Sequence, residues 1–109
     1  MSVGEYVYKI MLDEGAQVPD HKRVEVINQV EDAAVNRRFI WLEHAGKVIG
    51  FLTYMEKNNK VFINNCIIYK GCRNAFNFIA LRRFFRSNFK GKQFYWENKR
   101  KNDKLCYVK

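Results

Sequence analysis

Cysteine is scarce in this sequence, which contains only Cys66, Cys72 and Cys106. An odd number of cysteines without paired spacing argues against a disulfide framework. None of the spacings matches a common zinc motif, and the only histidines are His21 and His44, so we expect no metal site. The thiols are therefore predicted to be reduced, as they are in cytoplasmic proteins.

Long hydrophobic runs are also missing. No apolar stretch approaches the roughly 20 residues that a membrane span needs, and the N-terminus lacks the apolar segment of a signal peptide. Proline occurs once and no segment is rich in glycine or serine, so no linker is visible. We therefore predict a single cytoplasmic domain over residues 1–109, without a membrane segment.

Acidic residues become scarce after the first third of the chain. Residues 1–34 hold seven acids and three bases, for a net charge of −4, whereas residues 35–109 hold four acids and seventeen bases, for a net charge of +13. Such a field favours polyanions, which include nucleic acids and the phosphates of a nucleotide-like cofactor. The alternative is that the basic side chains simply keep a small domain in solution.

The apolar residues change between helix-like and strand-like spacing along the chain. This pattern predicts helices over residues 3–12, 21–35 and 75–88, and strands over residues 38–43, 48–55, 60–69, 93–97 and 104–108. The turns at residues 44–47 and 58–59 are short enough to make the strands that they join antiparallel. The order α-α-β-β-β-α-β-β predicts an α/β domain of the α+β kind, with a central mixed, mostly antiparallel sheet.

The helix over residues 75–88 combines apolar and basic residues. The apolar positions, which we expect to form one broad face against the sheet, are Phe76, Phe78, Ile79, Leu81, Phe84 and Phe85. Positive charge is expected on the opposite face near the C-terminal end, where it suits the helix dipole, and it comes from Arg82, Arg83 and Arg86.

The junction between the third strand and this helix is the part of the sequence that points to chemistry. A helix that follows a short turn presents free N–H groups and a positive dipole end, and both suit a pyrophosphate. Lys70 and Arg73 add full positive charge beside that end, and Gly71 lets the backbone approach a ligand closely. The alternative is an ordinary structural turn, since every such junction has unpaired donors.

This junction resembles a family signature. Tyr69-Lys70-Gly71, followed three residues later by Ala75 and preceded by an antiparallel meander, resembles the acetyl-CoA signature of the GNAT superfamily of N-acetyltransferases. The run Val48-Ile49-Gly50-Phe51 is similar to the central strand of that family. The resemblance covers about residues 20–100 and is closest to the short, truncated acetyltransferase-like proteins of bacteriophages. The chain departs from the family pattern at Arg73, where the first loop glycine is usual.

The resemblance implies an acyl-CoA-dependent N-acyltransferase that moves an acetyl group from acetyl-CoA to an amine. It implies that the backbone of Ile67 and Ile68 holds the pantetheine arm, and that Tyr107 protonates the leaving thiolate. The family's glutamate base has no counterpart in this chain, because Asn64 and Asn65 stand in the strand that would carry it. The residues implied to hold the pyrophosphate are Lys70, Gly71, Arg73, Asn74 and Ala75.

The alternative is an inactive scaffold of the same fold that binds a nucleic acid or a host protein. Basic residues interleaved with aromatic ones are typical of nucleic-acid surfaces. The residues predicted to carry this binding are Arg82, Arg83, Arg86, Lys90 and Lys92. Both hypotheses place the protein in the cytoplasm, which is that of the host if a phage encodes it. The open sheet edge at the last strand could pair with a second copy of the chain, so we expect either a monomer or a homodimer.

Overall fold

The computed structural model describes residues 1–98 and 104–108, with side chains as far as Tyr95. The regular elements are α1 (Val3–Asp13), η1 (Asp20–Lys22), α2 (Arg23–Val35), β1 (Phe39–His44), β2 (Lys47–Lys57), β3 (Lys60–Ile68), η2 (Lys70–Cys72), α3 (Ala75–Asn88), β4 (Gln93–Asn98) and β5 (Lys104–Val108). The predicted order of helices and strands is confirmed, and the two short 3₁₀ turns, η1 and η2, are additions to it.

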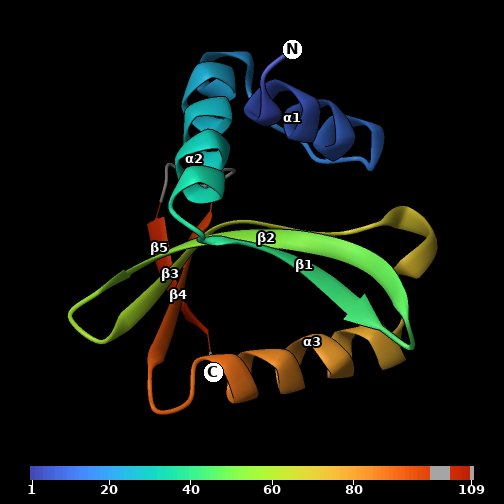
Figure 1. Ribbon diagram of the computed structural model, residues 1–109, viewed down its shortest axis with the longest axis vertical. Helices are drawn as coiled ribbons and strands as arrows, with labels where there is room; N and C mark the ends of the chain where they lie inside the picture. Colours follow the sequence, from blue (N-terminus) through green and yellow to red (C-terminus); the bar gives the residue numbers. More distant parts are fainter. Residues whose placement is uncertain (99–103, 109) are drawn as a thin grey trace.

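One five-stranded sheet runs in the order β1-β2-β3-β4-β5 (Figure 1). Every neighbouring pair is antiparallel except β3 and β4, which are parallel because α3 makes the crossover between them. The two hairpins turn through Ala45-Gly46 and Asn58-Asn59, and all four of these residues have positive φ. Two-residue turns of this kind match the twist of antiparallel strands, so the predicted mixed, mostly antiparallel sheet is confirmed.

Helices cover both faces of the sheet: α1 and α2 lie on one face and α3 on the other (Figure 1). Successive side chains of a strand point to opposite faces, so β2 contributes to two cores. Phe51 packs with Val26 of α2 in the first core, and Leu52 packs with Leu42 and Ile68 in the second, which α3 covers. The residues of β2 from Ile49 through Thr53 are buried for this reason.

The prediction for the apolar face of α3 is only partly correct. Leu81, Phe84 and Phe85 do pack against the buried strand residues. However, the side chains at the N-terminal end stay exposed, with exposed fractions of 77% for Phe76, 48% for Phe78 and 49% for Ile79. A helix buries a stripe with spacings of three and four residues, and here that stripe contains Asn77 in place of an aromatic residue. Three large apolar side chains therefore face solvent.

None of the helices in the described residues has the length and apolar character needed to cross a bilayer.

Candidate functional site

The parallel pairing of β3 with β4 is short and ends inside β3. It runs from Lys60, opposite Gln93, to Ile63, opposite Trp96, whereas β3 itself continues to Ile68. In the described residues, no strand pairs with the other side of β3 after Ile63. Residues 64–68 therefore form an unpaired edge of β3, immediately before the loop that leads into α3.

A β-bulge marks the start of this unpaired edge. Thr53 of β2 lies opposite Asn65, but Tyr54 lies opposite Ile63, so Asn64 is an extra residue in β3. A bulge bends its strand and increases the local twist. The bend at Asn64 is consistent with β3 leaving β4 one residue earlier, at Ile63.

The hydrogen bonds at the end of β3 show which backbone groups point away from β2. The Tyr69 N–H donates to the Ile49 carbonyl at 2.8 Å, so Tyr69 faces β2. Because bonding alternates along an antiparallel ladder, Ile67 also faces β2, whereas Cys66 and Ile68 direct their backbone groups to the unpaired edge. Of the two residues that the resemblance implies for the pantetheine arm, Ile68 lies on this edge and Ile67 belongs to the ladder. Cys66 is the edge residue that sequence reasoning missed.

Arg73 joins the end of α1 to the end of β3. Its Nε donates to the Ile68 carbonyl at 2.8 Å, and its Nη2 donates to the Glu14 carbonyl at 2.7 Å. The Glu14 carboxylate in turn accepts a bond from the Lys70 N–H at 2.7 Å. The C-terminal end of a helix favours a cation, so Arg73 has a structural use at the position where the family pattern has glycine.

Tyr69 stands at the start of this loop with its phenol held protonated. Burial raises the pKa of Tyr69 above its ordinary value, and the nearby carboxylate of Glu14 raises it further. The loop thus has a carboxylate from the end of α1 against it, together with the phenol of Tyr69 and its own basic residues.

The loop leaves some backbone donors without a partner. Asn74 caps α3 by accepting from the Asn77 N–H at 2.9 Å, and the Asn77 side chain donates to the Cys72 carbonyl at 2.6 Å. Within the described part of the chain, the N–H groups of Gly71 and Ala75 have no such acceptor. A Cβ placed on Gly71 would meet nothing within 4 Å, so the space beside the loop is open.

The stretch of sequence that contains the loop and α3 carries charge of one sign. No Asp or Glu occurs between Glu56 and Glu97, whereas that stretch contains nine Lys and Arg residues. Lys92 pairs with Glu56, which makes it the exception among the residues predicted to bind nucleic acid. The others are exposed on or just after α3, and they are Arg82, Arg83, Arg86 and Lys90.

A hollow of about 590 Å³ lies between the end of β1 and α3. Its lining includes the exposed Phe76 and Ile79 beside Arg83, with Glu43 and His44 on the β1 side. Glu43 lies on β1, and β2 separates that strand from β3 and its unpaired edge. Apolar surface and positive charge thus meet on α3.

The residues considered for proton transfer are spread over the fold. Glu56 pairs with Lys92 and lies opposite Val61, before the point where β3 and β4 separate. The backbone of Tyr107 lies in β5 opposite Tyr95, and its side chain lies outside the described residues. Neither Glu43 nor Glu56 is brought to the bulge.

Among the described residues, no group of three or more His, Cys, Asp or Glu side chains is arranged to hold a metal ion. Comparison of the chain with models of known protein families, with curated proteins and with solved structures finds no match. A function must therefore be inferred from the contacts and register of this chain alone.

Proposed function

We propose that this protein binds acetyl-CoA along the unpaired edge of β3 and transfers the acetyl group to an amine. The observation that carries the proposal is the parallel β3–β4 pair that ends at Ile63 while β3 continues to Ile68. The pantetheine arm contains two amides, which can pair with an open strand edge as an added strand does. Cys66 and Ile68 offer such an edge, although Arg73 already takes the Ile68 carbonyl. The resemblance of the sequence to the GNAT superfamily supports the same proposal.

The loop after β3 supplies the complementary end of the site. The N–H groups of Gly71 and Ala75 and the dipole of α3 favour a pyrophosphate there. Lys70 lies in the same loop and adds full positive charge. The acid-free stretch that surrounds the loop raises the local concentration of polyanions.

Acetyl-CoA supplies its acetyl group as a thioester. The amine nitrogen forms a bond to the thioester carbonyl carbon, the carbon–sulfur bond breaks, the amine loses a proton and the thiolate gains one. Asn64 and Asn65 cannot take the amine proton, because a neutral amide is not a base at physiological pH. Tyr107 remains the proposed donor to the thiolate.

Acetyl-CoA is expected to raise the thermal unfolding midpoint of the protein. A ligand present at about 100 times its Kd adds ~2.7 kcal/mol of stability, which corresponds to roughly 10 °C for a domain of this size. Most of the increase should persist when the salt concentration is raised, because strand-edge bonds are not screened as charge pairs are. Differential scanning calorimetry at two salt concentrations measures both effects. An unchanged midpoint at millimolar acetyl-CoA would rule out the proposed function.

A second candidate, binding of single-stranded nucleic acid, is favoured by the surface of α3. The helix exposes aromatic rings next to arginines, and stacking on such rings combined with phosphate contacts is the usual mode of single-strand binding. Phe78 and Arg82 are one helical turn apart, as are Phe76 and the hollow-lining Ile79. The same surface carries no acidic residue of α3.

Binding of oligothymidylate is expected to weaken with salt if this second candidate is correct. Each neutralised phosphate contributes about 0.7 to the slope of log affinity against log salt for single strands. Replacing Arg82, Arg83 and Arg86 by glutamine should therefore reduce the slope by about 2. Arg37→Gln, at an exposed position in the turn between α2 and β1, is the control. If the wild type, the triple arginine variant and Arg37→Gln all showed the same slope of log affinity against log salt, α3 would be excluded as the binding surface.

A further inference from the structure

The outer edge of β1 is an unpaired strand edge (Figure 1). β1 is the first strand of the sheet, and within the described residues no strand pairs with its other side. Native proteins usually protect such an edge with lysine, proline or a bulge. The run Phe39-Ile40-Trp41-Leu42 contains neither lysine nor proline, and the bulge between β1 and β2 adds Ile49 to β2, which leaves β1 regular. β1 is therefore open to pairing with another strand.

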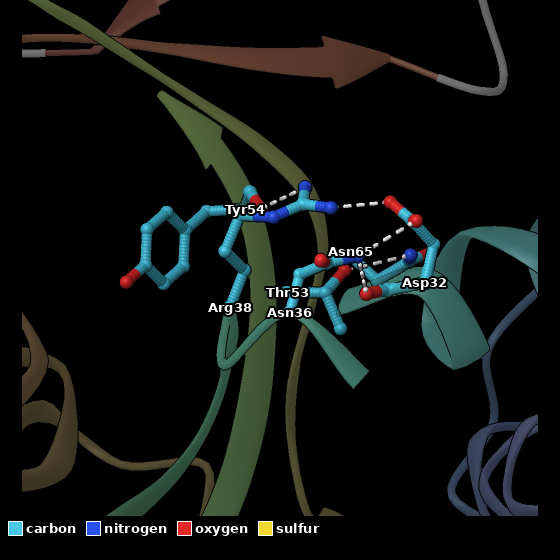
Figure 2. Close-up of polar contacts among 6 residues, drawn as sticks. All are labelled: Asp32, Asn36, Arg38, Thr53, Tyr54 and Asn65. Carbon is cyan, nitrogen blue, oxygen red and sulfur yellow. Dashed lines mark hydrogen bonds and ion pairs between the residues drawn. The ribbon is translucent and has the colours of Figure 1, made fainter. Parts of the chain in front are cut away.

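Arg38 fixes the start of β1 against β2 (Figure 2). The Tyr54 N–H donates to the Arg38 carbonyl at 3.1 Å, and the Arg38 guanidinium donates to the Tyr54 carbonyl at 3.0 Å. The guanidinium also pairs with Asp32 of α2, whose carboxylate accepts a second bond from Asn36 at 2.9 Å. The backbone of Arg38 therefore faces β2, and this sets the pattern of hydrogen bonds along β1.

This pattern shows which residues of β1 direct their backbone groups outward. Bonding alternates along an antiparallel ladder, so the next residues that bond to β2 are Ile40 and Leu42. The residues between and after them, Phe39, Trp41 and Glu43, therefore point their N–H and C=O groups to the open edge. Trp41 stands at the centre of this edge, and its side chain is 46% exposed. The edge thus combines free backbone groups with an exposed aromatic ring.

We propose that two copies of this chain form a dimer in which the outer edges of their β1 strands pair in antiparallel order. With a twofold axis at Trp41, the tryptophans of the two copies lie opposite each other, and Phe39 of each copy lies opposite Glu43 of the other. This register uses every backbone group of β1 that faces outward. It joins the two five-stranded sheets into one continuous sheet.

The charges that flank β1 favour a second copy as the partner. The exposed Arg37 precedes the strand, and the exposed Glu43 lies near its end. An antiparallel pair of identical strands brings the basic start of each copy to the acidic end of the other, and opposite charges across strands stabilise such a pair. In a twofold dimer every contact occurs twice, so one self-complementary strand is sufficient.

The hollow beside α3 lies at the same edge. Its lining from the sheet comes only from Glu43 and His44 of β1, which is the edge strand. Its lining from α3 follows spacings of three and four residues and includes the exposed Phe76 and Ile79. A twofold axis perpendicular to the sheet keeps the α3 helices of both copies on one face, so these apolar side chains approach the second copy across the axis. The dimer thus explains why Phe76 and Ile79 face solvent in a single chain.

The oligomeric state of matched variants tests this proposal. Sedimentation velocity at about 100 µM should give the mass of two chains for the wild type. Trp41→Lys and Trp41→Glu each remove the central ring and place like charges opposite each other, so each should raise the dissociation constant of the dimer at least about 100-fold. Val24→Lys adds the same charge at an exposed position of α2 and should leave the dimer unchanged.

A mixture of the two Trp41 variants tests the register. If the tryptophans lie opposite each other on the axis, an equimolar mixture of Trp41→Lys and Trp41→Glu pairs opposite charges, and it should associate about tenfold more tightly than either variant alone. Far-ultraviolet circular dichroism and thermal unfolding check that each variant is folded. A mixture that associates no more tightly than its components would overturn the proposed register.

Amide hydrogen exchange of the wild type gives a readout that needs no variant. The N–H groups of Phe39 and Trp41 should become protected only at concentrations at which the dimer forms, whereas those of Ile40 and Leu42 should be protected at every concentration. Exchange at Phe39 and Trp41 that does not depend on concentration would overturn the proposal. A wild type that stays a monomer at about 100 µM would do the same, as would a folded Trp41→Lys variant that dimerises as well as Val24→Lys.

Discussion

Replacing Gly50 by alanine is expected to lower the free energy of unfolding by about 3 kcal/mol, at the upper end of overpacking effects. An added Cβ would lie 2.0 Å from the Ile67 carbonyl oxygen and 3.0 Å from the Ile68 Cα. Both atoms belong to the backbone of β3, which cannot move without disturbing its ladder with β2. Urea denaturation followed by circular dichroism measures the loss.

Gly71→Ala is the matched control for this substitution. A Cβ at Gly71 meets nothing within 4 Å, so its stability should stay within about 0.5 kcal/mol of the wild type. If Gly50→Ala were as stable as this control, the close approach of β2 to β3 at Gly50 would be wrong.

Replacing Gly71 by tryptophan is expected to remove acetyl-CoA binding while leaving the fold intact. The open space beside Gly71 accepts a side chain, but an indole there blocks the approach to the loop N–H groups. A loss of at least about 100-fold in affinity would abolish the ~2.7 kcal/mol of ligand stabilisation expected for the wild type. Isothermal titration calorimetry gives the affinity, and thermal unfolding without ligand checks the fold.

Val24→Trp provides the control for adding an indole to the surface. Val24 is 68% exposed on α2 and carries no charge, so this variant should bind acetyl-CoA with wild-type affinity. If Gly71→Trp also bound acetyl-CoA normally, the cofactor would have to lie away from the loop between β3 and α3.

Much of the fold could be predicted from local signals in the sequence. The turns at Ala45-Gly46 and Asn58-Asn59 adopt positive φ, and they set the antiparallel meander by themselves. The face of α3 could not be predicted as well, because its apolar residues surround more of the helix than one sheet covers. Which of them are buried depends on packing, and the structure selects Leu81, Phe84 and Phe85.

The position of the candidate site along the chain could be predicted from the sequence, but which of its groups face the unpaired edge could not. The sequence predicts a loop at residues 70–74, and these residues do lie between β3 and α3. Whether Cys66 or Ile67 directs its backbone groups to the unpaired edge depends on which residues of β3 hydrogen-bond to β2. The spacing of apolar residues in the sequence does not determine this. The hydrogen bond from Arg73 to the Glu14 carbonyl joins residues that are 59 positions apart in the sequence, and no local sequence pattern predicts such a contact.

The most direct test of the central claim is the amide ¹H–¹⁵N spectrum of the uniformly labelled protein during a titration with acetyl-CoA. Binding along the unpaired edge of β3 predicts that the largest shifts occur at Cys66, Ile68, Gly71 and Ala75. A spectrum that stays unchanged at millimolar acetyl-CoA would contradict this, as would shifts confined to Arg82, Arg83 and Arg86. The latter result would mean that phosphates bind the surface of α3 and that the strand edge is not a cofactor site.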